Sequence, residues 1–298
     1  MNLSNEKLAI ITFNLVPDIG PIRLGKLRTY FGSVADALKA LKGNAGFDRQ
    51  DLANALNVSE KLVDRVVLSL KQADAGKELD NSEKEGVEII CYEDDNYPQA
   101  LLHLYDSPSV LYVKGSLKPQ DTLCVALVGS RRCTNYGLAA AAKLSGEFAQ
   151  MGVTTVSGLA RGIDTQVHKE TLKAGGRTIA VLGNGLLKHY PPENRLLEEK
   201  IVKQGALVSE FPLEARPDKI NFPRRNRLIS GLALATVVVE AEIKSGAIIT
   251  ANLSAEQGKD VFCVPGSIFS KYSSGCHELL KCGAAPITSA TDAAEAIR

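Results

Sequence analysis

The feature that most constrains the fold is a regular alternation that begins after Pro119. Short apolar runs recur, and each is followed by a glycine-bearing loop and then by an amphipathic helical pattern. The runs are Leu123–Val128, Val153–Val156, Thr178–Leu182, Ala206–Ser209, Ala235–Glu240, Val261–Val264 and Pro286–Thr288. Strands that alternate with helices form right-handed parallel βαβ units, because a parallel neighbour needs a crossover connection. The sequence therefore predicts an α/β fold with a doubly wound, mostly parallel sheet.

The residues before this alternation follow a helical pattern. From Ser4 to about Leu70, apolar residues recur at helical spacing between turns that contain proline or glycine. Residues 71–86 are polar and helix-prone and form either a connector or an exposed helix, and two short strands are predicted after them, at Val87–Tyr92 and Val110–Lys114. We therefore predict two domains, a small all-helical domain at residues 1–80 and an α/β domain at residues 87–298.

Composition limits the class of protein. Of the 298 residues, 45% are hydrophobic and 23% are charged, which indicates a globular chain rather than a disordered or fibrous one. The formal net charge is +1, so attraction to nucleic acid must come from a local cluster of charge. The sequence has no secretory signal pattern and no run of 18 apolar residues, so we expect a cytoplasmic protein that does not enter the membrane.

The six cysteines point to the same compartment. They include no Cys-x-x-Cys pair, and Cys124 and Cys263 lie inside apolar runs, as reduced core thiols do. Cys276, His277 and Cys282 lack the fourth ligand and the spacing of a zinc site. We therefore expect no bound metal ion.

The loops that follow the strands form the candidate site, because ligands of open α/β sheets bind beyond the carboxyl ends of the strands. Glycines and small hydroxyl residues crowd these loops, which are Gly129–Arg132, Ser157–Asp164, Gly183–Gly185 running on to His189–Pro192, Glu210–Pro212, Glu240–Gly246 and Pro265–Ser267. Backbone N–H groups in such loops can hold phosphate. The dinucleotide and P-loop motifs are absent, so no cofactor is expected. Gly129 beside Arg131 predicts a phosphate contact, and the alternative is a tight strand-to-helix turn.

The densest basic segment is RPDKINFPRRNR at residues 216–227. Its five cations are Arg216, Lys219, Arg224, Arg225 and Arg227. Arginines beside Phe222 in one loop suit a single nucleic-acid strand, through phosphate contacts and base stacking. Alternatively, Arg225 or Arg227 is held structurally by a buried carboxylate. The candidates for that carboxylate are Glu210 and Glu240.

Candidate catalytic residues are few. Asp164 and His168 are four residues apart on the helix predicted after Gly162, where they would face the same side as an acid and a base. The alternative is that Asp164 caps this helix and His168 is partly buried. Glu240 and Glu242 at a strand end could serve a nucleoside hydrolase, and pairing with arginine explains them equally well.

One motif in the helical region has a possible role in DNA binding. Val16–Ile22, followed by Leu24, Leu27 and Phe31, has the form of a helix-hairpin-helix turn, whose amides can meet a DNA phosphate. The alternative is a simple packed hairpin in which Gly20 supplies a positive φ. Both interpretations stay open.

Several motifs, taken in order, resemble the DprA/Smf family of bacterial DNA-processing proteins. They are Val128–Arg131, Ser157–Asp164 with His168, Tyr190–Pro191, Ser209–Glu210, Phe222–Leu232, Glu240–Ala241, Ser245–Gly246, Thr250, Gln257–Gly258 and Val264–Ser267. The resemblance covers the region from Tyr97 to Thr288, and the preceding helices look like the family's SAM-like domain. It implies an extended Rossmann fold without catalytic activity. It also implies binding of single-stranded DNA, dimerisation and loading of RecA recombinase during natural transformation.

The resemblance, together with the basic segment, also implies a set of DNA-binding residues. They are Gly129, Ser130, Arg131, Arg161, Lys188, Lys219, Phe222, Arg224, Arg225, Asn226 and Arg227. Lys188 is included because Pro192 stands where some members of the family carry a basic residue after the Tyr-Pro pair.

The C-terminal part of the α/β domain is predicted to form a homodimer through Leu279, Leu280 and Ile287. A last strand exposes its edge and one apolar side unless something covers it, and a second copy is the simplest cover. A second class of function is a phosphoribohydrolase-like enzyme on a related scaffold. That class is recognised by P-G-G-x-G-T, to which Pro265-Gly266-Ser267 does not extend, so a DNA-binding mediator is favoured.

Overall fold

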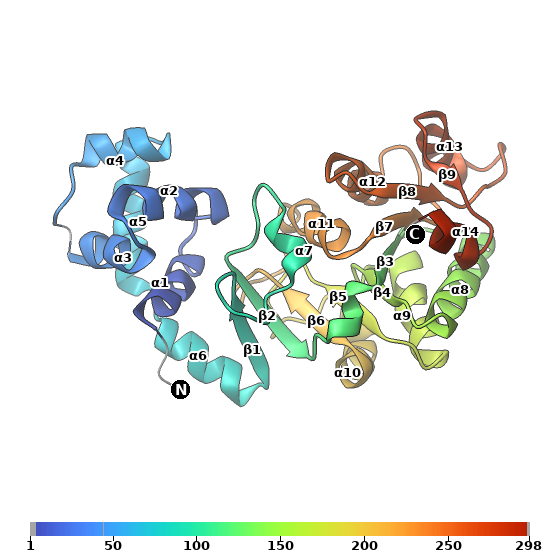
Figure 1. Ribbon diagram of the computed structural model, residues 1–298, viewed down its shortest axis with the longest axis horizontal. Helices are drawn as coiled ribbons and strands as arrows, with labels where there is room; N and C mark the ends of the chain where they lie inside the picture. The colour runs from blue at the N-terminus through green and yellow to red at the C-terminus, as the bar shows by residue number, and fades with distance from the viewer. Residues whose placement is uncertain (1–3, 44, 297–298) are drawn as a thin grey trace. The chain divides into compact units, whose positions relative to one another are not determined.

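The structure is a computed structural model that describes residues 4–43 and 45–296 (Figure 1). Residue contacts divide the chain into two units. The first unit comprises Met1–Tyr112 with Glu210–Leu213, and the second comprises Val113–Ser209 with Glu214–Arg298. This division groups the first strand and half of the second with the helices. The predicted domains at residues 1–80 and 87–298 stay a prediction about which parts fold together.

The first unit is mainly helical. Its described elements are α1 (Asn5–Asn14), α2 (Pro21–Phe31), α3 (Val34–Gly43), α4 (Arg49–Leu56), α5 (Glu60–Gln72), α6 (Ala75–Lys84), β1 (Val87–Cys91), α7 (Gln99–Leu102) and the start of β2 (Val110–Gly115). The helices up to Gln72 and the two strands lie where they were predicted, the polar stretch forms an exposed helix (α6), and the short helix α7 was not predicted. Side chains of Ser4, Asp48 and Asp74 accept hydrogen bonds from the first turns of α1, α4 and α6.

The turn between α1 and α2 corrects one expectation. Gly20 has φ −90° and ψ 179°, so it does not supply the positive φ expected of a packed hairpin. Gly20 is extended because Pro21, the first residue of α2, disfavours the helical conformation in the residue before it. The positive φ of this turn, 71°, belongs to Asp18, whose carboxylate lies 2.9 Å from the Arg65 guanidinium.

The strands of the second unit lie close to their predicted positions. They are β3 (Cys124–Val128), β4 (Thr154–Ser157), β5 (Thr178–Val181), β6 (Ala206–Ser209), β7 (Ala235–Val238), β8 (Asp260–Cys263) and β9 (Ala285–Pro286). The strand order of the sheet is β1-β2-β6-β5-β4-β3-β7-β8-β9, and the pairs from β6 to β9 are parallel. The predicted doubly wound, mostly parallel Rossmann-like sheet is confirmed.

The order of the strands defines where the winding reverses. From β3 the chain adds β4, β5 and β6 on one side, and then returns to place β7 on the other side of β3. Residues Val125–Val128 pair in register with Ala235–Val238 across this junction. In doubly wound sheets, the loops on either side of such a reversal leave a crevice at the carboxyl edge.

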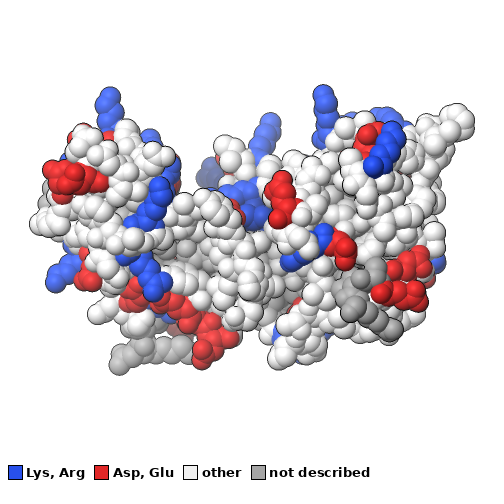
Figure 2. All heavy atoms as spheres, turned by 45° about the horizontal axis from the view of Figure 1, so that its top comes forward, with Lys and Arg blue, Asp and Glu red and all other residues white. Residues whose placement is uncertain are grey.

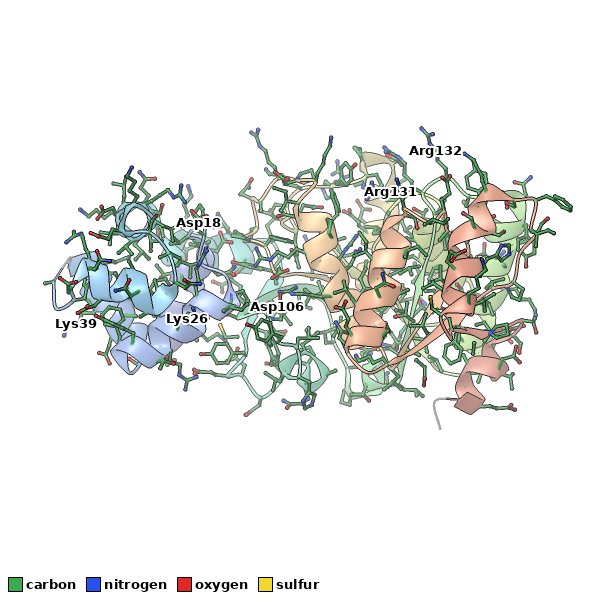
Figure 3. The ribbon with its side chains drawn as sticks, turned by 90° about the horizontal axis from the view of Figure 1, so that it is seen from above. Asp18, Lys26, Lys39, Asp106, Arg131 and Arg132 are labelled. Atoms are coloured by element: carbon green, nitrogen blue, oxygen red, sulfur yellow. The ribbon has the colours of Figure 1, made fainter. Side chains whose placement is uncertain are left out.

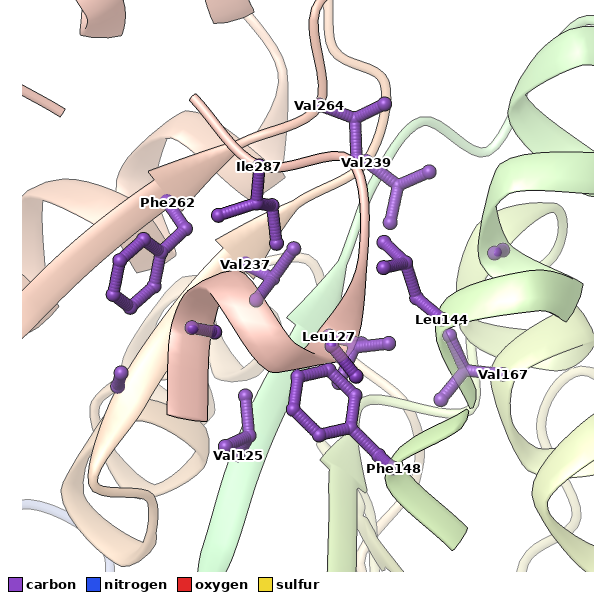
Figure 4. Packing of buried hydrophobic residues seen from close by; sticks show 14 of the residues in the cluster. Val125, Leu127, Leu144, Phe148, Val167, Val237, Val239, Phe262, Val264 and Ile287 are labelled. Atoms are coloured by element: carbon purple, nitrogen blue, oxygen red, sulfur yellow. The ribbon is translucent and has the colours of Figure 1, made fainter. Parts of the chain in front are cut away.

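Helices and short 3₁₀ turns connect these strands. They are η1 (Pro119–Thr122), α8 (Asn135–Gln150), α9 (Ile163–Lys173), η2 (Pro192–Asn194), α10 (Arg195–Gln204), α11 (Asn221–Leu232), α12 (Gly246–Glu256), η3 (Lys271–Ser273), α13 (Ser274–Lys281) and α14 (Ala290–Ala296). Apolar residues of α8, α9 and α14 form one core cluster with alternate residues of β3 and β7 (Figure 4). α11 and α12 pack against each other, with α11 also on β3 and α12 on β7.

A buried ion pair stabilises the end of the sheet opposite the carboxyl edge. The Arg177 guanidinium donates at 2.7 and 2.9 Å to the carboxylate of Asp121, and at 2.8 Å to the Ser116 carbonyl. Burial alone would raise the pKa of Asp121, but hydrogen bonds from Arg177 and from the Lys118 amide outweigh it and lower that pKa. Among the described residues, no helix is long and apolar enough to cross a membrane.

Candidate functional site

A cleft of about 600 Å³ opens at the carboxyl edge of the sheet, where the winding reverses. Its walls are the loop Val128–Arg132 after β3, the start of α11 and the start of α12. Arg131 and Arg132 project from this edge of the second unit (Figure 3). The cleft therefore lies where doubly wound sheets bind ligands, and the sequence predicted its β3 wall correctly.

Two glycines of the site are required by close packing. A Cβ atom at Gly129 would lie 2.5 Å from the Ile163 side chain, and one at Gly183 would lie 2.7 Å from the Phe222 ring. Both distances are shorter than any Cβ contact can be. Gly129 therefore brings the β3 loop onto α9, and Gly183 allows the Phe222 ring to pack beside the β5 loop.

Phe222 is the aromatic centre of the site. Its ring is half-buried, with the Tyr190 ring centroid at 5.3 Å and the guanidinium carbon of Arg131 at 5.5 Å. A cation over an aromatic face is attracted by the quadrupole of the ring. Phe222, Tyr190 and Arg131 line the mouth of the cleft and a small adjoining pocket. This arrangement offers an unpaired base a surface to stack on and its phosphate a guanidinium.

Arg225 is a buried residue of α11 that connects this helix to β5 and to the loop after β4. It is 3% exposed, and its guanidinium donates to the Gly158 carbonyl at 2.8 Å and to the Val181 carbonyl. Desolvation lowers the pKa of Arg225 to about 10, while the charge of Asp164 raises it. Burial conversely raises the pKa of the Asp164 carboxyl, opposed first by Arg225. The structure therefore supports the alternative that Arg225 is held in place by a buried carboxylate. That carboxylate is Asp164, and not Glu210 or Glu240.

The rest of the basic segment divides between the cleft and the interior. Lys219 is exposed and lines the cleft, and Arg224 is exposed one turn further along α11. Asn226 lines the cleft and donates to the Gly246 carbonyl at 3.2 Å, which ties α11 to the start of α12. Arg227 is 5% exposed and donates to the Arg224 carbonyl at 3.3 Å. One segment thus supplies both surface cations and buried supports.

Two predicted DNA contacts, Arg161 and Lys188, are ion-paired with carboxylates. Arg161 lines the small adjoining pocket and pairs with Glu193, and both side chains are about half exposed. Lys188 pairs with Glu214 and does not line the cleft. Surface pairs of this kind contribute little to stability, so either cation can exchange its carboxylate for a phosphate at small cost.

The predicted DNA-binding residues do not include the wall at the start of α12, although the loop Glu240–Gly246 that leads into it was among the candidate loops. Lys244, Ser245 and Gly246 line the cleft, and Lys244 is exposed. Ser245 is the N-cap residue of α12 but makes no side-chain capping bond. The helix therefore begins at the cleft with a first turn that no side chain caps, a place where anions are favoured. The loop after β7 was among the glycine-bearing loops, but nothing in its residue types singled out Lys244.

Three of the four candidate catalytic residues are committed to internal contacts, whereas Glu242 lines the cleft and lies 3.5 Å from the Lys271 ammonium at the surface. The carboxylate of Asp164 accepts from the backbone of Gly158 and Ala160, so it braces the preceding loop rather than capping α9, which begins after Gly162. His168 is fully buried and bonds Thr178 at 2.7 Å, and desolvation lowers its pKa to about 3. The carboxylate of Glu240 accepts from the amide and the hydroxyl of Thr134 at 2.8 Å, at the start of α8.

The predicted dimer residues are placed differently from one another. Leu279 and Leu280 lie on α13 and are partly exposed. Ile287 is fully buried in the core cluster with α8 and α14, so its side chain has no surface to offer a partner. Two other residues near this region are more exposed, Ile268 at 81% and Phe269 at 93%, in the loop after β8.

The fold and the cleft together define the class of protein. It is a Rossmann-like α/β protein with a cationic, aromatic-lined cleft at the reversal of its sheet, preceded by a helical unit. The chain belongs to the family of DNA recombination-mediator protein A, whose model matches residues 88–298. The predicted resemblance to the DprA/Smf family is confirmed.

Relatives with DNA-processing names support this assignment. Protein Smf of Synechocystis is 34% identical over 96% of this chain and 71% of its own length. DNA processing protein DprA of Streptococcus pneumoniae is 42% identical over 67% of this chain and 70% of its own. The crystal structure of DprA from Streptococcus pneumoniae has a TM-score of 0.80 at 32% identity, covering 98% of this chain and 97% of that one.

A second solved relative bears on the ligand. It is DNA processing protein A of Helicobacter pylori, described for its single-stranded DNA binding mode. Its TM-score is 0.63 at 31% identity, and the match covers 69% of this chain and 93% of that chain.

Proposed function

We propose that this protein binds single-stranded DNA in the cleft at the carboxyl edge of its sheet. The observation that carries the proposal is the grouping of Arg131, Phe222 and Lys219 around one cleft. Cations hold the phosphates while the aromatic ring stacks a base, and neither contact depends on base identity. The uncapped start of α12 beside Lys244 adds a further place for a phosphate.

Fluorescence anisotropy with labelled single-stranded and duplex oligonucleotides tests this proposal. If the cleft neutralises three to five phosphates, log K against log salt has a slope of about −2 to −3.5 for single strands. Raising the salt from about 50 to 200 mM then weakens binding roughly 20- to 130-fold. Affinity that does not depend on salt, or equal affinity for duplex, contradicts the proposal.

We further propose that the chain acts by binding and catalyses no reaction on the DNA. The support is the commitment of Asp164, His168 and Glu240 to internal contacts, which leaves none of them placed as a base. Incubation with nucleoside monophosphates and with oligonucleotides, followed by chromatography, is expected to return them unchanged. Release of a free base would instead favour the phosphoribohydrolase-like alternative.

The finer role that we propose is delivery of the bound strand to RecA recombinase during natural transformation, in the cytoplasm. Membership of the recombination-mediator family supports it. The expected result is faster RecA assembly on single strands in the presence of the protein. An Arg131→Glu, Lys219→Glu variant that accelerates RecA as well as the wild type does would contradict delivery from this cleft.

We also propose that the protein acts as a homodimer through the surface that carries Leu279 and Leu280. Support comes from the apolar side chain of Phe269, which is 93% exposed, and from the exposed edge strand β9. Sedimentation equilibrium at micromolar protein is expected to give twice the monomer mass, and Phe269→Glu or Leu279→Glu to give monomers. Ile287→Glu is unsuitable as a test because it would place a charge in the core.

A further inference from the structure

A groove in the first unit lies outside the proposed DNA site. It has a volume of about 350 Å³ and is formed by α2, by Tyr92 after β1, and by the residues between α7 and β2. Three large apolar or aromatic side chains on it are exposed: Ile22 at 42%, Leu102 at 40% and Tyr105 at 90%. Single exposed apolar residues are ordinary, but several gathered on one groove mark an interaction surface.

Gly25 is a second, independent sign that α2 meets a ligand from outside. It lies in the middle of α2 and lines the groove. A glycine inside a helix is less favourable than alanine, because it loses more backbone freedom on folding. A Cβ atom at Gly25 would meet no atom within 4 Å, so packing among the described residues gives no reason for a glycine there. An absent side chain allows another backbone to approach the helix closely.

The charge of the first unit selects the kind of partner. With 12 basic and 18 acidic residues, the unit has a net charge of −6. Figure 2 shows acidic side chains gathered along the lower edge of this unit, with Lys and Arg side chains elsewhere on the same face. Such a surface repels a phosphate backbone and attracts a basic partner.

Acidic residues also adjoin the groove itself. Tyr92 is followed by Glu93, Asp94 and Asp95, and Tyr105 is followed by Asp106, which Figure 3 labels. The cation that lines the groove, Arg28, lies 3.7 Å from the Glu93 carboxylate and donates to the Tyr92 hydroxyl at 3.3 Å. The groove thus has an apolar floor with carboxylates next in the chain to two of its residues, whereas its wall α2 carries the cations Arg23, Lys26 and Arg28.

We propose that this groove docks a basic, amphipathic segment of a partner protein. Large apolar side chains of the segment fill the space between Ile22 and Tyr105, and its backbone passes over Gly25. Its lysines and arginines face the carboxylates of Glu93, Asp95 and Asp106. The proposal stands apart from DNA binding, because every residue it uses belongs to the first unit.

Selection of displayed random peptides on the full chain tests the proposal. The selected peptides are expected to carry a net positive charge and at least two large apolar residues. A synthetic peptide of the selected sequence is then titrated against variants. Gly25→Leu and Tyr105→Ser are each expected to weaken its binding at least 10-fold. The matched controls are Gly146→Leu, at a glycine inside α8 that also has no atom within 4 Å of its Cβ position, and Leu68→Ser, at a side chain that is 60% exposed outside the groove.

Gly25→Ala is a second variant at the same position, and it tests the proposal even where Gly25→Leu does not fold. It is expected to raise the midpoint of thermal unfolding, since the cost of a helical glycine is removed, and still to weaken the peptide at least 3-fold. Selection of no peptides, selection of acidic ones, or equal binding by wild type and groove variants would overturn the proposal. Loss of duplex DNA binding or of self-association in Gly25→Leu would also overturn it, by assigning the groove to DNA or to a second copy. Single-strand binding is expected to be unchanged in Gly25→Leu, so failure here leaves the proposed function standing.

Discussion

The helical unit has 12 basic and 18 acidic residues, whereas the sheet unit has 23 basic and 16 acidic ones. Their net charges are −6 and +7, and these nearly cancel in the +1 of the whole chain. The near-neutral net charge of the whole chain therefore says little about the charge of either unit. Electrostatic attraction acts over about a Debye length, roughly 8 to 10 Å, so a ligand meets the charge of one unit and not the sum.

The helix N-termini at the cleft also differ from several of those in the helical unit. In the first unit, carboxylates of Asp48 and Asp74 cap α4 and α6, and the Glu6 carboxylate accepts from the amides of Val34 and Ala35 at the start of α3. In the second unit, α9, α11 and α12 begin near the cleft without a side-chain cap. The positive ends of α3, α4 and α6 are thus neutralised within the chain, whereas those of α9, α11 and α12 are left for a ligand at the cleft. The contrast does not extend to every helix, since α2 and α5 also lack a side-chain cap and Thr134 caps α8.

The largest effect is expected from removing the buried cation of the sheet unit. Arg177→Met leaves the Asp121 carboxylate buried without its partner, so the sheet unit should lose about 3 kcal/mol of stability. Hydrogen exchange resolved by segment is expected to show the loss in residues 113–209 and 214–298. Arg49→Met, which breaks an exposed pair with Asp64 in the helical unit, is the control and should cost less than about 0.5 kcal/mol. Equal losses would show that the pair at Arg177 is no stronger than a surface pair.

Charge reversal tests which unit binds the DNA. The double variant Arg131→Glu, Lys219→Glu removes two charged hydrogen bonds, each of about 1.5 kcal/mol, so single-strand affinity should fall about 100-fold. The slope of log K against log salt should also become shallower by about 1.4. The control is the double variant Lys39→Glu, Lys61→Glu in the helical unit, which changes the net charge of the chain by the same amount. It should alter the affinity for single strands by less than about twofold. A similar loss in both variants would show that net charge matters and not the cleft.

Mild acid is expected to destabilise the sheet unit selectively. His168 has a folded-state pKa of about 3, below its usual value, because burial disfavours the charged imidazole. At a pH between the folded-state pKa of His168 and its usual pKa, the imidazole takes up a proton only in the unfolded chain. The stability that the neutral His168 contributes is therefore complete above the usual pKa and is lost as the pH falls. The loss from pH 7 to pH 5 should be about 2 kcal/mol.

Denaturant unfolding at several pH values measures this loss. His168→Gln should flatten the pH dependence, whereas His103→Gln, at an exposed histidine of the helical unit, should leave it as in the wild type. If His168→Gln retains the full dependence between pH 7 and pH 5, another group is responsible.

The smallest effect is expected at the helix caps. Asp48→Ala removes the side-chain bond to the Asp51 amide and should destabilise the helical unit by about 1 kcal/mol. Ser245→Ala, at the N-cap position of α12, removes no capping bond and should change stability by less than about 0.5 kcal/mol. Thermal unfolding followed by circular dichroism compares the two. A larger cost at Ser245 would show that the start of α12 is capped after all.

Most of the secondary structure could be predicted from the sequence because it depends on local pattern. The strand at Ala206–Ser209 was predicted residue for residue, and β7 was predicted to extend to Glu240 although it ends at Val238. Arg131, Phe222 and Lys219 were also predicted in the candidate site, from a glycine loop and a dense basic segment, and all three line the cleft.

The sequence by itself determined the alternation of strands and helices, the glycine loops and the cluster of cations, because each of these is a property of neighbouring residues. Only the tertiary structure decided that β7 returns to pair with β3, which places the start of α12 and Lys244 on the cleft. It also decided that Arg225 supports the site from within and that Ile287 belongs to the core. Burial and strand order depend on contacts between residues far apart in the chain, and a pattern of neighbours does not contain them.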